Sequence, residues 1–459
     1  MQEQDCIAAI ATPNGKSAIA VIRISGKNAI AIVDEIFVGK ILKNEKSHTL
    51  HFGKIIDENK IIDEVLVSIF KNPHSYTGEE SVEISCHGST FVVKEILNLL
   101  LKKNIRLATA GEFTQRAFMN GKLDLSQAES VADLIDAENK GQHQLAIKQM
   151  RGGYSSLIEN LRQELIDFTA LLELELDFSE EDVEFADREK FLTLIQKIKK
   201  VIAELIQSFR YGNVLKNGVP VALVGEPNVG KSTLLNALLN EEKAIVSEIA
   251  GTTRDFIEDE IQIEGISFRF IDTAGLRKTD DILESKGIER SFQKLKDAEI
   301  VLYLADINKD YKEIAAMVNE MTFSAAQKVI VVLNKSDKMN NCDAYDIEEA
   351  ISTLTSFKTI EIAATTKRNL EKLKNLLVET IEQQKINTDI QVSNIRHLDA
   401  LQNAFINLEK VEEGLHHKIS GEFISIDARM ALENLGSITG KITNEDVLSS
   451  VFSRFCIGK

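Results

Sequence analysis

The chain has 459 residues, which predicts about three domains, each large enough to bury its own core. Apolar residues make up 44% and charged residues 27%, as in globular proteins, and no apolar run reaches the roughly 18–20 residues that a membrane span requires. The net charge of −17 excludes a general nucleic-acid-binding surface, because neutralising phosphates needs a basic face.

The first 120 residues mix strand and helix patterns. Residues 18–24, 65–70 and 81–85 are short runs rich in β-branched side chains, and they predict strands. Residues 92–102 have the spacing of an amphipathic helix. We therefore predict an α+β domain over residues 1–120.

Residues 121–215 have the pattern of a helical domain. Proline is absent between Pro73 and Pro220, and apolar residues recur at spacings of three and four. Two series show this spacing: Leu125, Ala128, Val131, Ala132 and Ile135, then Leu157, Leu161, Leu165, Phe168 and Leu172.

A glycine-rich loop follows at residues 225–232, which are Gly-Glu-Pro-Asn-Val-Gly-Lys-Ser. It lies between a predicted strand at 221–224 and a predicted helix from Thr233, which is the context of a phosphate-binding loop. Backbone N–H groups and the helix N-terminus would surround the phosphates. Lys231 would contact the β- and γ-phosphates as a catalytic cation, and Ser232 would ligate Mg²⁺.

Two segments have the order of nucleotide switches. Residues 251–255, Gly-Thr-Thr-Arg-Asp, lie where a switch I threonine, Thr253, would complete the Mg²⁺ shell. The predicted strand at 266–271 leads to residues 272–275, Asp-Thr-Ala-Gly. There Asp272 would hold Mg²⁺ through water, and the Gly275 N–H would meet the γ-phosphate.

The base-recognition motif comes after a buried strand predicted at 329–333. It is Asn-Lys-Ser-Asp at 334–337, and Asp337 can accept hydrogen bonds from guanine N1 and N2, which adenine does not offer. The backing motif is Ala-Ala-Thr at 363–365, in which the Ala364 N–H would bond guanine O6. Because its flanking side chains contribute little, guanine specificity would rest mainly on Asp337.

Each motif alone is explained equally well by a turn after a strand. Four of them in the right order predict a Ras-like P-loop GTPase domain with a mostly parallel sheet over residues 216–384. Its predicted GTP-binding residues are Asn228, Val229, Gly230, Lys231, Ser232, Thr233, Ser247, Glu248, Ile249, Ala250, Gly251, Thr252, Thr253, Asp272, Thr273, Ala274, Gly275, Asn334, Lys335, Asp337 and Ala364.

Residues 385–459 return to the helical spacing, from Ile395 to Leu408 and from Ile424 to Leu432. We predict that they are the second half of the helical domain, with the GTPase domain inserted between the halves. Two independent helical domains are the alternative, because periodicity does not show which helices touch. The predicted fold is therefore multidomain α/β.

The four cysteines form no Cys-x-x-Cys pair, which is typical of a reducing cytoplasm without disulfides or structural zinc. The chain starts with Gln, Glu and Asp in place of the basic residues of a signal peptide. We therefore predict a cytoplasmic protein.

Motifs along the chain resemble the tRNA modification GTPase MnmE family, also called TrmE. The resemblance covers essentially all 459 residues. Its motifs are Ala-Thr-Pro at 11–13, Arg-Ile-Ser-Gly at 23–26, Tyr-Thr-Gly-Glu-Glu at 76–80, Cys-His-Gly at 86–88, residues 111–118, residues 122–129, and Phe-Cys-Ile-Gly-Lys at 455–459.

The resemblance implies a GTP hydrolase that works with an FAD-dependent partner, MnmG, on tRNA. Together they would add a carboxymethylaminomethyl or aminomethyl group at carbon 5 of the wobble uridine of certain tRNAs. A 5-formyltetrahydrofolate-type folate would supply the one-carbon unit. The resemblance also implies a homodimer, a heterotetramer with MnmG, and tRNA held largely by that partner, which suits so acidic a chain.

In the family the N-terminal domain dimerises and binds the folate, and the matching residues are Arg23, Glu83, Lys122 and Lys459. The cations would meet the glutamyl carboxylates, and Glu83 would pair with the amino face of the pterin. Without the resemblance, Arg23 and Glu83 would be interpreted as an ion pair on neighbouring strands. Cys456 is either a thiol near the folate pocket or a small apolar plug.

Leu276 stands where Ras-like switches carry a water-positioning glutamine, and leucine cannot orient a water molecule. The resemblance implies that K⁺ supplies positive charge beside the β- and γ-phosphates. Its ligands would be Asn228 and, mainly through backbone carbonyls, Ser247, Ile249 and Thr252.

The resemblance further implies that Glu284 aligns the attacking water as a catalytic residue. From the sequence alone, Glu284 would be a solvated acid among neighbouring acids. Because a monovalent ion binds weakly, a second GTPase domain would close over the site and order switch I.

Two other classes of protein were weighed against this prediction. An Era-like ribosome-assembly GTPase needs a basic RNA-binding module such as a KH domain, whereas residues 385–459 are not basic and lack a GXXG loop. A folate-binding scaffold with a vestigial GTPase is disfavoured by the intact Lys231, Ser232, Asp272 and Asp337.

Overall fold

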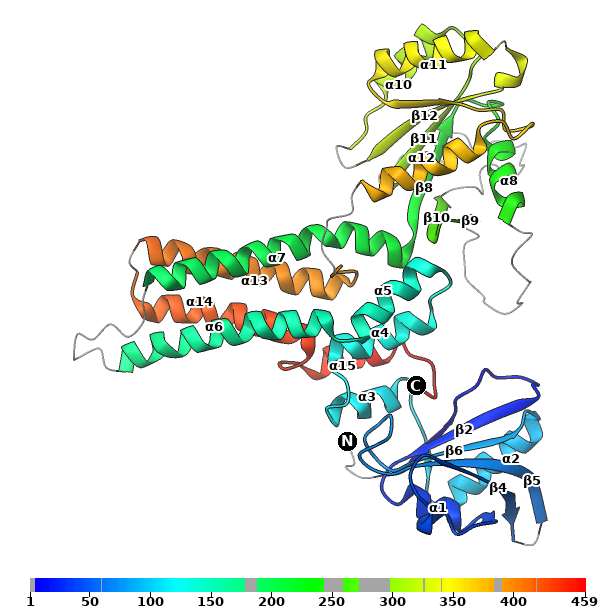
Figure 1. The fold of residues 1–459 in the computed structure, drawn as a ribbon, viewed down its shortest axis with the longest axis vertical. Coiled ribbons are helices and arrows are strands. Elements are labelled where there is room, and N and C mark those ends of the chain that lie inside the picture. The colour runs from blue at the N-terminus through cyan, green and yellow to red at the C-terminus, as the bar shows by residue number, and fades with distance from the viewer. Residues whose placement is uncertain are drawn as a thin grey trace, which may run out of the picture. The chain divides into compact units, whose positions relative to one another are not determined.

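The computed structural model describes residues 5–58, 60–177, 188–242, 259–271, 298–324, 327–339, 341–383, 390–417 and 419–459. The chain divides into two compact units (Figure 1). The first comprises Met1–Asp136, Ala146–Lys199 and Ala400–Lys459, and the second comprises Ala137–Leu145 and Lys200–Asp399.

The N-terminal part of the first unit is built on one sheet. Among the described residues its strand order is β3-β4-β5-β6-β2-β1-β7, and the neighbouring pairs are antiparallel except β1 with β7. The strands are β1 (Ile7–Ile10), β2 (Ile19–Ser25), β3 (Phe37–Val38), β4 (Thr49–Asp57), β5 (Lys60–Phe70), β6 (Ser81–His87) and β7 (Arg106–Leu107). The strands and the helix predicted in this region are therefore confirmed.

Alternation along β2 decides which side chains reach each face of this sheet. Ala20, Ile22 and Ile24 are buried in a core that includes side chains of α1 (Ala29–Asp34) and α2 (Thr90–Lys102). Arg23 points to the other face, directly opposite Glu83 of β6. The face away from these two helices is thus the one that carries the predicted folate residues Arg23 and Glu83.

A network of ion pairs joins β7 to α3 (Glu112–Met119). Arg106 Nη2 lies 2.5 Å from Glu112 Oε1, and Arg116 Nη2 lies 3.0 Å from the same oxygen. Both arginines also contact Asp5, at 2.6 Å each. Since Glu112 is buried and accepts from both guanidinium groups, the network ties the start of the sheet to the helix that follows it.

Acidification is expected to weaken the N-terminal domain through Glu112. Burial by itself raises the pKa of Glu112, but hydrogen bonds from Arg106, the Thr109 N–H and Arg116 outweigh it and hold the pKa at about 2 instead of 4.5. Because the folded-state pKa is lowered, this stability is present above about pH 4.5 and is lost as the pH falls toward 2. Calorimetry of the parent and Glu112→Gln should show a difference on the order of 2 kcal/mol at pH 6 that closes near pH 2. A difference independent of pH would contradict this assignment.

Long helices form the rest of the first unit and cross into the second. They are α4 (Leu125–Ile135), α5 (Lys140–Met150), α6 (Gly153–Asp177), α7 (Arg188–Asn217), α13 (Ile395–His416), α14 (Gly421–Thr439) and α15 (Glu445–Phe452). A capping box starts α4, in which the Asp124 carboxylate accepts from the Gln127 N–H and the Gln127 side chain accepts from the Asp124 N–H.

The two helical halves pack together within the first unit. Arg429 of α14 pairs with Glu173 of α6 at 2.7 Å, and Lys199 of α7 pairs with Glu412 of α13 at 2.7 Å. Within the first half, the rings of Phe168 of α6 and Phe191 of α7 stack, with centroids 4.0 Å apart, so α6 and α7 pack together as well. These contacts favour one helical domain made of two sequence segments over two independent helical domains.

The second unit contains a mostly parallel sheet. Its described strands run in the order β13-β12-β11-β8-β10-β9, and only the β9–β10 pair is antiparallel. The strands are β8 (Val219–Gly225), β9 (Asp259–Ile263), β10 (Ile266–Ile271), β11 (Ile300–Asp306), β12 (Lys328–Asn334) and β13 (Lys358–Glu361). The helices are α8 (Lys231–Glu242), α10 (Tyr311–Glu320), α11 (Asn341–Thr355) and α12 (Leu370–Glu382).

The carboxyl ends of β8, β12 and β13 lead into residues 225–231, 334–337 and 363–369. In open parallel sheets this edge is where ligands bind. The predicted phosphate and base motifs therefore share one edge of the sheet. In the parts of the chain that are described, no helix has the length and low charge needed to cross a membrane.

Candidate functional site

The phosphate loop connects β8 to α8 and depends on two glycines. Gly225 and Gly230 have φ of 149° and 99°, and a Cβ at either position would overlap Leu304 O or Asn334 Nδ2, respectively. Asn228 is also left-handed, with φ of 63°. A side chain at either glycine would displace the loop, which explains the spacing of the motif.

Lys231, the first residue of α8, folds back over this loop. Its Nζ donates to Gly225 O at 2.5 Å and to Glu226 O at 2.8 Å. Burial lowers the pKa of Lys231, against the opposing effect of the Glu226 charge. An anionic phosphate in the loop would relieve that burial, so the arrangement fits a nucleotide. Ser232 is exposed at the start of the same helix, where its hydroxyl is accessible to a cation.

Asn334 joins the phosphate loop to the base side of the site. Its Nδ2 donates to Val229 O at 2.8 Å, and its Oδ1 accepts from the Ala364 N–H at 3.0 Å. The predicted partner of guanine O6 is thus already engaged by Asn334, so O6 would share this N–H or replace Asn334. Asp337 is exposed at the end of the same motif, in the short 3₁₀ helix η4 (Ser336–Lys338).

The side chain of Lys335, in the base motif, is held by a carboxylate at the end of the neighbouring strand β11. Lys335 is left-handed, with φ of 69°, and its Nζ lies 2.8 Å from Asp306 Oδ2 at the end of β11. Burial alone would raise the pKa of Asp306, but hydrogen bonds from Lys335 and Asn308 lower it. Asp306 therefore stays ionised and fixes Lys335 beside the base motif.

The switch residues lie outside the described part of the chain. This applies to the predicted Mg²⁺ ligand, the predicted K⁺ ligands other than Asn228, the switch II motif and the catalytic glutamate: Ser247, Glu248, Ile249, Ala250, Gly251, Thr252, Thr253, Asp272, Thr273, Ala274, Gly275 and Glu284. Of the predicted metal ligands, the structure places Asn228 and Ser232, both with exposed side chains. Their neutral oxygen donors suit K⁺ and Mg²⁺.

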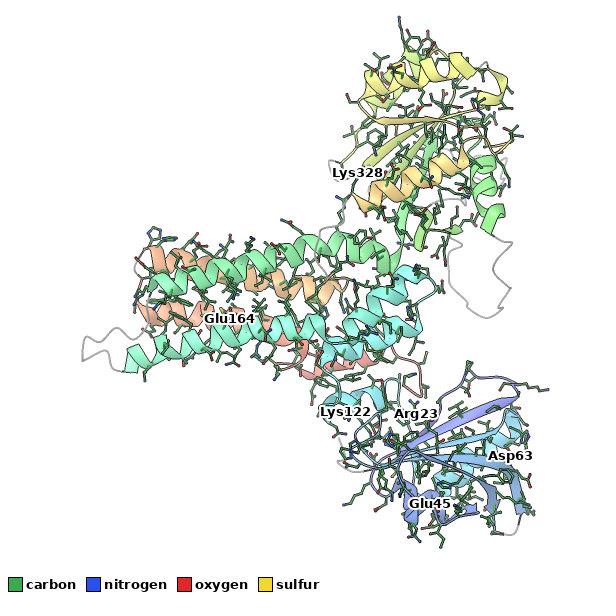
Figure 2. All side chains as sticks on the ribbon, viewed as in Figure 1. Arg23, Glu45, Asp63, Lys122, Glu164 and Lys328 are labelled. Carbon is green, nitrogen blue, oxygen red and sulfur yellow. The ribbon has the colours of Figure 1, made fainter. Side chains whose placement is uncertain are left out.

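Three of the four predicted folate residues, Arg23, Glu83 and Lys459, meet in the first unit. Figure 2 labels Arg23 and the fourth residue, Lys122, in that unit. Arg23 Nε lies 2.9 Å from Glu83 Oε1, so the ion pair on neighbouring strands is confirmed. Arg23 also donates to Gly458 O at 3.3 Å, which brings the C-terminal segment to this face. Burial and the Arg23 charge lower the pKa of Lys459, while Glu83 opposes them. A bound carboxylate would relieve this crowding of cations, so the residues fit an anionic ligand.

Two aromatic rings complete this cluster, and sequence reasoning did not assign them a role. The Arg23 guanidinium lies 5.5 Å from the centroid of Tyr76 and 5.8 Å from that of Phe113. Lys122 is connected to this cluster only indirectly. Its Nζ donates to Pro73 O at 3.1 Å, and Pro73 lies in the loop that carries Tyr76. Cys456 is exposed, which disfavours the alternative of a small apolar plug.

Replacing Gly458 by alanine is expected to release the C-terminal segment from this face. Gly458 has φ of 105°, and a Cβ there would overlap Ile10 O, so the carbonyl that Arg23 holds must move. Carboxypeptidase should trim Gly458→Ala at least about tenfold faster than the parent, because local opening costs less. Ser453→Ala, at an exposed position before the segment, serves as the control. Equal trimming would show that the contact does not hold the segment.

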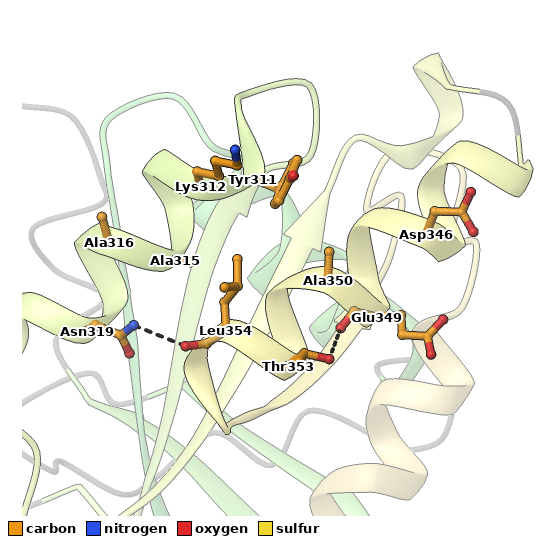
Figure 3. Close-up of a pocket in the computed structure, with 10 residues that line it drawn as sticks. All are labelled: Tyr311, Lys312, Ala315, Ala316, Asn319, Asp346, Glu349, Ala350, Thr353 and Leu354. Atoms are coloured by element: carbon orange, nitrogen blue, oxygen red, sulfur yellow. Dashed lines mark hydrogen bonds between the residues drawn. The ribbon is translucent and has the colours of Figure 1, made fainter.

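The described surface has hollows that are separate from these residues. One of about 710 Å³ lies between α10 and α11 and is lined by Tyr311, Lys312, Ala315, Ala316, Asn319, Asp346, Glu349, Ala350, Thr353 and Leu354 (Figure 3). None of these is a predicted site residue. The predicted nucleotide residues that the structure describes therefore lie at the carboxyl edge of the sheet and do not line this hollow.

The parallel sheet, the phosphate loop with Lys231 and the motif ending in Asp337 define a P-loop nucleotide-binding protein. Two family models match around that domain: "GTP-binding protein TrmE N-terminus" over residues 6–122 and "MnmE helical domain" over residues 125–456. The chain belongs to the MnmE family of tRNA modification GTPases.

Curated relatives match over the full length. The chain is 50% identical to the tRNA modification GTPase MnmE of Christiangramia forsetii and 51% identical to that of Flavobacterium johnsoniae, with 100% of each chain covered. It is 50% identical to that of Bacteroides thetaiotaomicron, over 99% of this chain and 100% of the relative. The resemblance noted from the motifs is thereby confirmed.

Proposed function

We propose that this protein is a GTPase of the cytoplasm that acts in the modification of the wobble uridine of tRNA. The observation that carries the proposal is the hydrogen-bonded path from Val229 of the phosphate loop through Asn334 to Ala364, which links the phosphate and base motifs. Full-length identity of about half to MnmE relatives supports the tRNA role. With an FAD-dependent MnmG-type partner, the protein would place a carboxymethylaminomethyl or aminomethyl group at carbon 5.

GTP would bind with its phosphates in the loop and its base against Asp337. Lys231 would leave the carbonyls of Gly225 and Glu226 for the β- and γ-phosphates, and Ser232 with Thr253 would hold Mg²⁺. Mg²⁺ would neutralise charge between these phosphates. The other predicted GTP-binding residues, including Asp272 and Gly275, would complete the contacts with the nucleotide.

Hydrolysis would depend on K⁺ because Leu276 cannot orient water. Asn228 supplies a side-chain oxygen from the phosphate loop, and Ser247, Ile249 and Thr252 would complete the site. K⁺ would supply positive charge between the β- and γ-phosphates, and Glu284 would align the attacking water. Paired GTPase domains in a homodimer would retain this weakly bound ion.

Turnover in K⁺ is expected to exceed turnover in Na⁺ by at least about tenfold at equal ionic strength, as one lost charge-stabilising contact would predict. Phosphate release at saturating GTP measures it. Asn228→Ala should lower the K⁺ rate to the Na⁺ rate while leaving the Na⁺ rate unchanged. GDP affinity should be the same in both salts, because the base contacts do not involve the ion. Equal turnover in both salts would remove the potassium mechanism.

The N-terminal cluster would bind a 5-formyltetrahydrofolate-type folate. Arg23 and Lys459, with Lys122 nearby, offer cations for the glutamyl carboxylates, and Glu83 offers a carboxylate for the pterin. The tRNA would be held largely by the MnmG partner in a heterotetramer, because this chain carries a net charge of −17.

The cellular role is tested by mass spectrometry of tRNA from cells that lack the protein. The wobble modification should disappear and return with the parent gene. Lys231→Ala and Arg23→Gln should each fail to restore it, because the first removes the phosphate cation and the second removes the folate cation. Modified tRNA in the deletion strain would contradict the proposed role.

A further inference from the structure

The guanine-backing loop of this chain lacks polar side chains where it meets the base. Ala363 and Ala364 are both buried, and Thr365 points to solvent. The Ala364 N–H must nevertheless be held in place, because it is the proposed donor to guanine O6. Some other group therefore has to fix the loop of residues 363–369.

The buried carboxylate of Glu361, at the end of β13, contacts the far side of that loop. Its Oε1 accepts from Arg368 Nη2 at 3.1 Å and from Asn369 Nδ2. Asn369 Nδ2 also donates to Glu361 O at 3.1 Å. The Ala363 N–H closes the loop by donating to Arg368 O at 3.2 Å. The Glu361 carboxylate thus holds the C-terminal end of the loop that presents Ala364, and the backbone bond ties that end to the start of the loop.

The Asn369 side chain contacts Glu361 and does not cap α12. Asn369 is the N-cap residue of α12, where an asparagine side chain normally accepts from the first helical N–H groups. Here it has φ of 58° and makes no side-chain cap, and its amide turns to Glu361 instead. The other carboxylate oxygen, Glu361 Oε2, is buried without a hydrogen-bond partner among the described residues. The missing cap of α12 and the unpaired Glu361 oxygen each lower the stability of the fold. This indicates that the contact between Glu361 and Asn369 positions the loop.

We propose that Glu361, through Arg368 and Asn369, is the positioning residue for guanine recognition, replacing the polar side chains that the backing motif lacks. The inference rests on the proposed GTP site. Glu361, Arg368 and Asn369, here called the Glu361 brace, would position the Ala364 N–H for guanine O6. Asp337 would make the contacts with N1 and N2. The brace reaches the phosphate loop through Ala364, Asn334 and Val229.

Three nucleotides separate these contacts by calorimetric titration of the full-length protein. GDP carries O6, the N1 hydrogen and the 2-amino group, IDP lacks only the amino group, and 2-aminopurine riboside diphosphate keeps the amino group but lacks both O6 and the N1 hydrogen. Glu361→Gln should lower the affinity for GDP and for IDP by about tenfold each. This is the loss expected for one hydrogen bond to a charged or positioned group. The affinity for 2-aminopurine riboside diphosphate should change by less than about twofold.

Two further variants keep the test decisive. Arg368→Gln should reproduce the Glu361→Gln pattern, and the double variant should be no weaker than either single one, because both residues act through one contact. Arg368 is partly exposed, so it carries the test if Glu361→Gln does not fold. Glu371→Gln is the matched control, since it removes a carboxylate from the first turn of α12 whose side chain is 77% exposed and pairs with Lys374.

Equal weakening of all three nucleotides would overturn the inference, because it would mean general damage to the site. Unchanged GDP affinity in Glu361→Gln, or a loss of the same size in Glu371→Gln, would also overturn it. A parent protein that binds ADP as well as GDP would instead defeat the proposed GTP site itself.

Discussion

Lys231→Ala is expected to lower kcat/KM for GTP by on the order of 10³-fold, the loss seen when a charge-stabilising donor is removed from a transition state. Lys231 is the cation whose Nζ lies inside the phosphate loop, on the carbonyls of Gly225 and Glu226. Its removal leaves the β- and γ-phosphates without their fixed ammonium donor. Conversion of GTP to GDP in quenched samples under single-turnover conditions measures the loss separately from product release.

Lys309→Ala provides the control for charge. Lys309 also sits beside the phosphate loop, where it pairs with the Glu226 side chain, but it is 44% exposed. Since an exposed ion pair contributes little, turnover in Lys309→Ala should stay within about threefold of the parent. Turnover in Lys231→Ala within about tenfold of the parent would show that the loop does not bind the reacting phosphates.

Asp337→Asn is expected to reverse the base preference of the protein. The parent carboxylate is exposed and would accept from guanine N1 and N2, whereas an asparagine amide suits the added oxygen of xanthine. GTP affinity should fall by on the order of 100-fold, which corresponds to the loss of hydrogen bonds to a charged acceptor. XTP affinity should rise in the same variant.

Competition of GTP and XTP against a fluorescent GDP measures this switch. Asp310→Asn is the matched control, because Asp310 is an N-cap residue of α10 whose carboxylate accepts from the Lys312 N–H and lies outside the base motif. Unchanged GTP affinity in Asp337→Asn would show that the base binds elsewhere.

Local pattern predicted the elements that carry the phosphate and base motifs. The strands expected at 221–224, 266–271 and 329–333 lie within β8, β10 and β12, because their apolar runs end in glycine or polar loops. Strands β1, β3, β4, β7, β9, β11 and β13 were not predicted. The two residues of β7 carry no pattern of their own, and the apolar run of β11 suits a helix as well as a strand.

The remaining contacts of the site depend on residues far apart in sequence. Asn334 reaches Val229 and Ala364 across 105 and 30 positions, and no spacing rule predicts that it engages the Ala364 N–H. The contact of Glu361 with Arg368 and Asn369 is local in sequence but was missed, because those residues lie outside the recognised motif. The sequence feature that could have indicated this contact is the absence of polar side chains at 363–364.

The alternative of a ribosome-assembly GTPase is also addressed by the fold. Beyond Ile390, the described residues form α13, α14 and α15, and no strand of a KH-type module occurs among them. The switch residues, including Glu284 and Thr253, lie outside the described part of the chain, so their roles stay predictions.

The hydrogen bond from Arg23 to Gly458 spans 435 positions of the chain. During synthesis, the sheet that carries Arg23 can form long before the ribosome reaches Gly458. A recombinant fragment limited to the first domain would therefore contain these strands yet lack the C-terminal carbonyl that Arg23 holds. A fusion tag attached after Lys459 would follow closely on the carbonyl that Arg23 holds, so tag placement at the amino end is the safer choice for measurements on this cluster.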